Sequence, residues 1–76
     1  MHTFDFYIKY NGQQVAQSTG NTTQNACWIW DTQEKYYREA GFVYRNRQVI
    51  NNHSQVQYMT RLTDIVELIM IAKEAA

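Results

Sequence analysis

The start of the chain alternates apolar and polar side chains with the period of a half-buried strand. Every second residue over 4–10 is aromatic or aliphatic, and most residues between them are polar or charged. Asn-Gly follows at 11–12, and this pair is the strongest short signal for a tight hairpin turn. The pattern predicts a strand over 4–10, a turn, and a weaker second strand over 13–18.

The next segment has the period of a helix. Several side chains at 21–23 are suited to capping a helix start, and Gly41 stands where a left-handed residue ends one. A stripe about 100° wide runs along this segment and faces a core. Its members are Ala26, Ile29, Trp30, Gln33, Tyr37 and Ala40. We therefore predict a helix between these signals, with Trp30 buried.

Trp28 falls on the side of this helix opposite the stripe, and Tyr36 falls at the edge of the stripe. One interpretation is that the Trp28 ring lies over Lys35 or under the loop that precedes the helix. Another is that the ring anchors a partner, because tryptophan is enriched among interface hot spots. A misplaced helix is the third. We take the anchor as the working hypothesis.

The last third of the chain supports two predictions. A strand over 42–50 and a polar turn come first. After the turn, Ser54 and Gln57 form a Ser-x-x-Gln capping box, which favours one long helix. Alternation over 55–62 instead favours another strand, with a helix starting near Thr63. We prefer the long helix.

The predicted fold is a single small α+β domain over 1–76. It has an antiparallel sheet of three strands and two helices packed on one face, in the order ββαβα. The alternative for 55–62 makes four strands, in the order ββαββα.

The predicted second helix is apolar nearly all round. The side chains expected to face the core are Ile65, Val66, Ile69 and Ala72. Ile71 points to the opposite side, with Leu68 and Met70 on the flanks. Such a helix is normally buried on more than one side, and 76 residues supply little protein for a second cover. We expect self-association or a partner surface there; a deeper central helix is the alternative.

Seven basic and seven acidic residues give no net charge, which argues against a dedicated nucleic-acid binder. Arg45 and Arg47 nevertheless lie two apart on a predicted strand, so we place both on one outward face. With Lys9 and Arg38 they form the candidate nucleic-acid contact. Cross-strand pairing with Asp5, or simple solubility, is the preferred explanation of these arginines.

The chain offers little catalytic chemistry. Cys27 is the single cysteine, and no motif joins it to His53 or His2 as a base. No histidine or acidic pattern has metal-ligand spacing, and the three glycines are dispersed. We expect neither an enzyme nor a bound cofactor or metal; an enzyme that uses Cys27 is the least favoured hypothesis.

The chain shows no export signal, and its longest apolar run, 68–72, is far shorter than the roughly 20 residues that span a bilayer. These features predict a cytoplasmic protein without a membrane partner. Small size and an Asn/Gln-rich sequence are also typical of regulators and inhibitors encoded by phages and other mobile elements.

The function expected from the sequence is a non-catalytic interaction module, and a homodimer, that binds a partner protein. The residues assigned to the contact are Trp28, Tyr36, Leu68 and Ile71. The alternative is a weak nucleic-acid-binding regulator that uses the basic residues named above.

Overall fold

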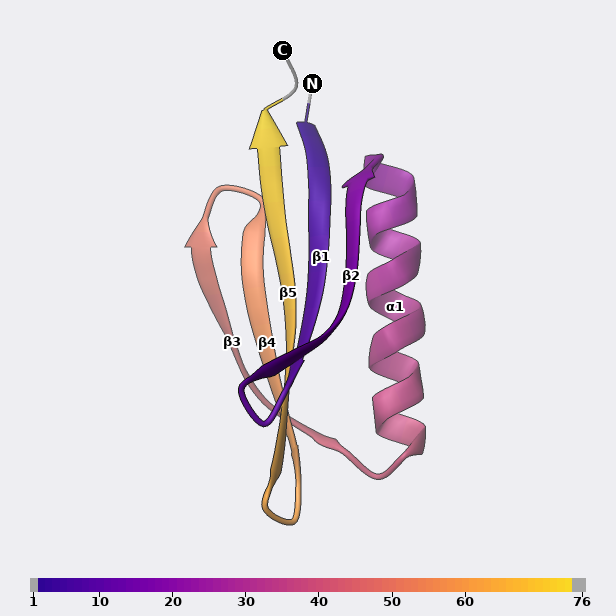
Figure 1. Ribbon diagram of the computed structural model, residues 1–76, viewed down its shortest axis with the longest axis vertical. Coiled ribbons are helices and arrows are strands. Elements are labelled where there is room, and N and C mark those ends of the chain that lie inside the picture. The colour runs from indigo at the N-terminus through magenta and orange to yellow at the C-terminus, as the bar shows by residue number, and fades with distance from the viewer. Residues whose placement is uncertain (1, 75–76) are drawn as a thin grey trace.

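The structure, a computed structural model, describes residues 2–74 as one antiparallel sheet and one helix. The strands are β1 (His2–Tyr10), β2 (Gln13–Asn21), β3 (Val43–Asn51), β4 (Ser54–Arg61) and β5 (Asp64–Glu74), and the helix is α1 (Thr23–Glu39). The sheet order is β2-β1-β5-β4-β3. Figure 1 shows α1 beside β1 and β2, and the connection from α1 crossing to β3 at the far edge.

The predicted first hairpin and helix are confirmed. Asn11 and Gly12 both have positive φ, as the turn between β1 and β2 requires. The Thr22 side chain caps α1 by accepting a hydrogen bond from the Asn25 amide at 3.2 Å.

Gly41 lies just past the C-cap of the helix in the expected left-handed conformation, with a φ of 96°. The Gly41 amide donates to the Arg38 carbonyl, and the Phe42 amide donates to the Tyr37 carbonyl. This pair of bonds is a Schellman motif, and the Phe42 ring packs edge-on against Tyr37 at 5.4 Å, as the motif favours.

The predicted second helix is wrong, and so is the predicted fold of three or four strands with two helices. Residues 54–74 form β4 and β5, which gives five strands and one helix. Ser54 and Gln57 do not cap a helix: the Ser54 hydroxyl accepts from the Ala72 amide on β5 at 2.8 Å, and Gln57 is fully buried in β4.

The physical reason lies in β5, the middle strand of the sheet. It is rich in β-branched residues, and it pairs with β1 on one side and β4 on the other. A strand with apolar residues on both faces gives a continuous apolar run without alternation. A short run of that kind cannot be distinguished from a buried helix by periodicity.

The core lies between α1 and one face of the sheet. From the sheet it takes alternate residues of the two central strands, Phe4, Phe6 and Ile8 of β1 and Val66, Leu68 and Met70 of β5. Ala26 and Trp30 enter from α1, and the Trp30 ring meets Phe6 edge-on at 6.1 Å. Trp30 is 7% exposed, as predicted.

Candidate interaction surfaces

The face of the sheet that α1 does not contact is called here the open face. The cross-strand register places Tyr7 of β1 opposite Ile69 of β5, and Ile69 opposite Val56 of β4. Val56 is only 7% exposed, and Tyr7, Ile69 and the neighbouring Ile71 are half-buried. The middle of the open face is therefore apolar, although no element within residues 2–74 packs over it.

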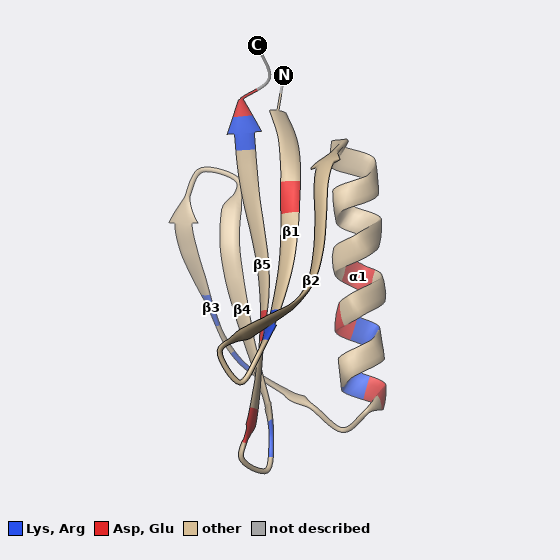
Figure 2. Ribbon diagram, in the orientation of Figure 1, with Lys and Arg blue, Asp and Glu red and all other residues tan. Residues whose placement is uncertain are grey.

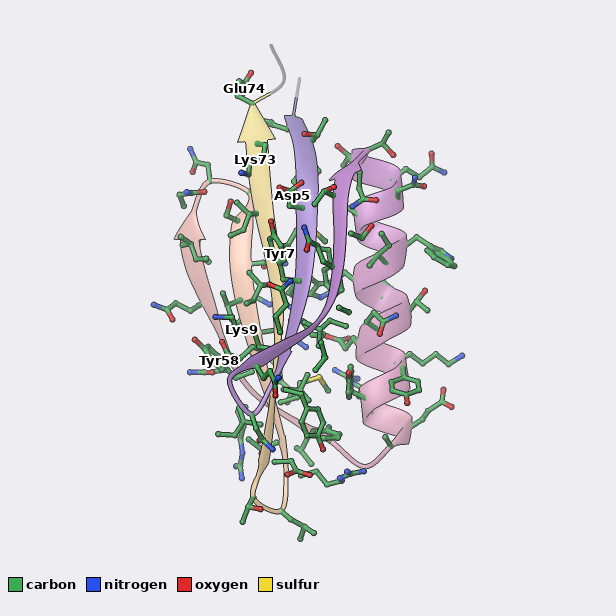
Figure 3. The ribbon with its side chains drawn as sticks, in the orientation of Figure 1. Asp5, Tyr7, Lys9, Tyr58, Lys73 and Glu74 are labelled. Atoms are coloured by element: carbon green, nitrogen blue, oxygen red, sulfur yellow. The ribbon has the colours of Figure 1, made fainter. Side chains whose placement is uncertain are left out.

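Charged side chains flank this apolar middle. At one end, the Asp5 carboxylate accepts hydrogen bonds from the Gly20 amide at 3.1 Å and the Tyr7 hydroxyl at 3.4 Å, and lies 3.7 Å from the Lys73 amine. Figure 3 shows Lys73, Asp5, Tyr7 and Lys9 in succession along β1 and β5. Asp5 thus has partners from β1, β2 and β5.

At the other end, Lys9 lies opposite Glu67 in the β1–β5 register. Both residues are half-buried, but their side chains form no ion pair or hydrogen bond with any residue of the described chain. The open face therefore carries one unpaired charge of each sign beside its apolar middle.

A second surface is the outward side of α1. Trp28 is 68% exposed and Tyr36 is 63% exposed. The segment before α1, expected as a loop, is the end of β2 and does not cover the Trp28 ring, and the Lys35 amine lies 3.9 Å from Glu39. The expected exposure of Trp28 is therefore confirmed, and its role in binding stays a prediction.

The four residues assigned to the partner contact do not form one surface. Leu68 is 0% exposed, in the core beneath α1, so its assignment to a contact surface is wrong. Ile71 lies on the open face, across the sheet from Trp28 and Tyr36. The assignment of Leu68 depended on the second helix, because a helix would have placed it on an outer flank.

The four basic residues are also dispersed. A β-bulge between Tyr44 and Asn46 places Arg45 and Arg47 on opposite faces, which corrects the prediction that they share one. Arg45 donates to the Thr60 hydroxyl at 2.7 Å, on the side of the open face. Arg47 donates to the Gln57 side-chain carbonyl at 2.8 Å, and its guanidinium lies 5.9 Å from the Trp30 ring centre on the helix side.

Lys9 lies on the open face, and Arg38 lies on α1 with its guanidinium 3.6 Å from Glu34. Figure 2 shows basic and acidic positions interspersed along α1 and along the two central strands. The arrangement gathers no continuous basic surface from these four side chains. On β3, an edge strand, two arginines and a bulge are features that discourage pairing with a further strand.

A groove of about 330 Å³ lies between the first half of α1 and the sheet. Cys27, Asp31 and His53 are among its lining residues, together with apolar side chains such as Trp30 and Met70. Cys27 and His53 therefore approach the same groove, which the sequence did not indicate. No hydrogen bond joins them, and residues 2–74 contain no group of three potential ligands placed to hold a metal ion.

The tip of the β4–β5 hairpin is a feature that the sequence analysis missed. Leu62 is 98% exposed there, at a φ of 54°. This left-handed conformation is unfavourable for leucine and common for glycine and asparagine. The sequence offers no signal for it, because Leu62 lies inside a stretch whose periodicity fits a helix.

A network of polar side chains holds this tip against the first hairpin. The Tyr10 hydroxyl donates to the Asp64 carboxylate at 2.7 Å, and the Asn11 side-chain amide donates to the same carboxylate at 3.2 Å. Arg61 donates to the Ala40 carbonyl at 2.8 Å and lies 4.6 Å from the Phe42 ring centre. The hydrogen bond from Tyr10 lowers the pKa of Asp64, with help from Asn11 and Arg61, and the same bond raises the pKa of Tyr10.

No family model, no curated protein and no solved structure matches this chain. Within residues 2–74, no helix combines the length and the apolar character needed to cross a membrane.

Proposed function

We propose that the protein is a non-catalytic interaction module that binds a partner protein through the outward side of α1 and also forms a homodimer. Bound to its partner, the module regulates it by occupying its surface. The observation that carries the proposal is the 68% exposure of Trp28 on a helix whose other tryptophan is buried.

An exposed indole on a regular helix contributes little to the stability of the fold, because it buries little apolar area there. The same ring is well suited to a partner pocket, since tryptophan combines a large apolar area with few rotatable bonds. Trp28 is held by a capped helix that is anchored to the sheet through Trp30, so binding needs little additional ordering. Tyr36, two turns further along and braced edge-on by Tyr37 at 5.1 Å, extends this surface.

The test is capture of cross-linked proteins from the cells that make this chain, with the wild type, Trp28→Ala and Tyr44→Ala in parallel. Tyr44 is a matched aromatic control, 45% exposed on β3, away from the outward side of α1. We expect one set of proteins to be retained by the wild type and by Tyr44→Ala and lost from Trp28→Ala. Retention of that set by folded Trp28→Ala would refute the proposed surface.

The salt dependence of the captured complex separates a protein partner from a nucleic acid. Binding that neutralises several phosphates weakens steeply between low and moderate salt, while an apolar contact around Trp28 changes little. A steep loss of binding would favour the nucleic-acid alternative, with Arg45 and Arg47 as the first residues to replace.

A further inference from the structure

We infer that two copies of this chain pack their open faces together about a two-fold axis that runs parallel to the strands, between β1 and β5. In this arrangement Lys9 of each copy pairs with Glu67 of the other. The inference rests on the proposed homodimer and specifies its surface and symmetry.

The first argument is the composition of β5. Val66, Leu68 and Met70 point into the core, while Ile69 and Ile71 point to the open face. Strands that are apolar on both sides occur where both faces of a sheet are covered. Here α1 covers one face, and the remaining described elements are strands of the same sheet. A second sheet of the same kind is a cover of matching shape, because aligned sheets pack face to face about 10 Å apart.

The second argument is the pair of unused charges. Lys9 and Glu67 are half-buried and directly opposite in register, without a side-chain ion pair between them. Asp5, in contrast, already has Gly20, Tyr7 and Lys73 as partners. Covering Lys9 and Glu67 costs less when the interface supplies each with an opposite charge. A second copy supplies both at once.

The symmetry operator follows from the register. A two-fold axis parallel to the strands sets β1 of one copy over β5 of the other at the same height. Lys9 then faces the second copy's Glu67, and Tyr7 faces the second copy's Ile69, each contact occurring twice. A two-fold axis across the strands through the Tyr7–Ile69 row would instead set Lys9 against Asp5, which already has partners, and Glu67 against Ile71. The first operator uses the unpaired charges and is the one we assign.

The size of the open face is adequate for a stable contact. Five strands about 4.8 Å apart, with about 3.3 Å for each residue of a nine-residue strand, give a face on the order of 700 Å². A standard protein interface covers about 800 Å² on each partner. We therefore expect a homodimer with a Kd in the micromolar range or below.

The experiment is a charge exchange followed by sedimentation velocity on the full chain. Lys9→Glu alone creates two Glu–Glu contacts in the homodimer, and Glu67→Lys alone creates two Lys–Lys contacts. Each is expected to weaken self-association by about 30-fold. An equimolar mixture of the two variants is expected to form a heterodimer with near wild-type affinity, because every Glu then meets a Lys.

Two controls keep the result interpretable. The double variant Lys9→Glu/Glu67→Lys restores complementary charges within one chain, so its homodimer is expected to match the wild type and to show that both substitutions are tolerated. Lys35→Glu, on the outward side of α1 where its side chain is 80% exposed, is expected to leave self-association unchanged.

The outcomes separate this inference from the proposed function. If the wild type dimerises but the single variants dimerise equally well, the homodimer stands and the assigned face is wrong. If the single variants weaken the dimer but their mixture does not restore it, the face is right and the assigned axis is wrong. If the wild type stays monomeric at roughly 500 µM, well above the Kd that such an interface supports, the homodimer is wrong. Partner capture through Trp28 is unaffected in each case.

Discussion

The two faces of the sheet have similar apolar middles, but only one of them is covered within the described chain. On the covered face, Leu68 and Val66 are 0% exposed beneath α1. On the open face, the neighbouring Ile65 of the same strand is 44% exposed, and the neighbouring Ile69 is half-buried. Adjacent side chains of one strand thus have different roles. The covered side holds the fold together, and the open side is available to another molecule.

The largest expected contrast comes from placing a charge on each face of β5. Leu68→Lys places an ammonium group in the core without a counter-ion, and a domain of this size rarely has more than about 3–5 kcal/mol to lose. We expect this variant to be unfolded by circular dichroism at 25 °C. Ile71→Lys, measured at a concentration where the protein is monomeric, is expected to lose only about 1 kcal/mol, because the lysine stem can lie along the sheet while its amine reaches water.

An unfolded Ile71→Lys would show that the open face belongs to the core of the monomer, and would remove the basis for a second molecule on that face. A folded Leu68→Lys would show instead that the position beneath α1 is not essential to the core.

The two tryptophans of α1 extend the same contrast to the helix. Trp30→Ala leaves a cavity against Phe6 and is expected to cost about 3–5 kcal/mol in the free energy of unfolding. Trp28→Ala is expected to change the free energy by less than about 0.5 kcal/mol, because the ring is mainly in water. Urea denaturation followed by circular dichroism measures both. A loss above about 2 kcal/mol for Trp28→Ala would contradict its assignment to a contact surface.

These contrasts also show which parts of the fold could be predicted from the sequence. Local signals were sufficient for the first hairpin and for the helix, because Asn11, Gly12 and Gly41 each specify a backbone conformation and Trp30 follows a helical period. The excess of apolar residues in the last third was also visible, and Ile71 does lie on an uncovered face.

What the sequence did not reveal depends on tertiary partners. Whether 64–74 is helix or strand was decided by pairing with β1, a strand more than fifty residues earlier in the chain, and 54–61 pairs in turn with β5 and β3. The bulge that separates Arg45 from Arg47 has no local signature in the sequence. The burial of Gln57 has no local signature either, because it depends on hydrogen bonds between its side chain and those of Arg47 and Glu34. Periodicity assigns residues to faces only while the period is unbroken.

A smaller effect is expected at the hairpin tip, where Leu62 is outside both faces. Because its side chain is 98% exposed, replacing it loses almost no packing. Asparagine tolerates a positive φ better than leucine, so Leu62→Asn is expected to raise the free energy of unfolding by up to about 1 kcal/mol. Thermal unfolding measures the gain, and Thr63→Asn at the next position is the matched control. A clear loss of stability in Leu62→Asn would mean that Leu62 packs against the protein.

The smallest expected effect concerns the polar network at the end of the covered face, and it depends on pH. Because the folded state lowers the pKa of Asp64, the contribution of Asp64 to stability is complete above its unfolded value of 3.8 and is lost as the pH falls through the folded pKa. Tyr10 has the opposite sign. Its folded pKa is raised, so its contribution is complete below its ordinary value of 10.0 and is lost as the pH rises through the folded pKa.

Asp64→Asn is therefore expected to reduce the loss of stability at acidic pH. It is also expected to reduce the loss of stability at alkaline pH, because the Asp64 carboxylate is the main cause of the raised Tyr10 pKa. Tyr10→Phe keeps an aromatic ring at the position whose ring centre lies 6.0 Å from that of Phe42. It removes the hydrogen bond to Asp64, so it should reduce the loss of stability at both acidic and alkaline pH. Urea denaturation from pH 2 to pH 11 tests this pair, since those limits bracket the ordinary pKa values of about 4 and 10. If Asp64→Asn keeps the wild-type profile, the Tyr10–Asp64 hydrogen bond does not fasten the end of the covered face, and the pairing of β1 with β5, the Asn11–Ile65 hydrogen bonds and the packing around Phe42 hold the two hairpins together there.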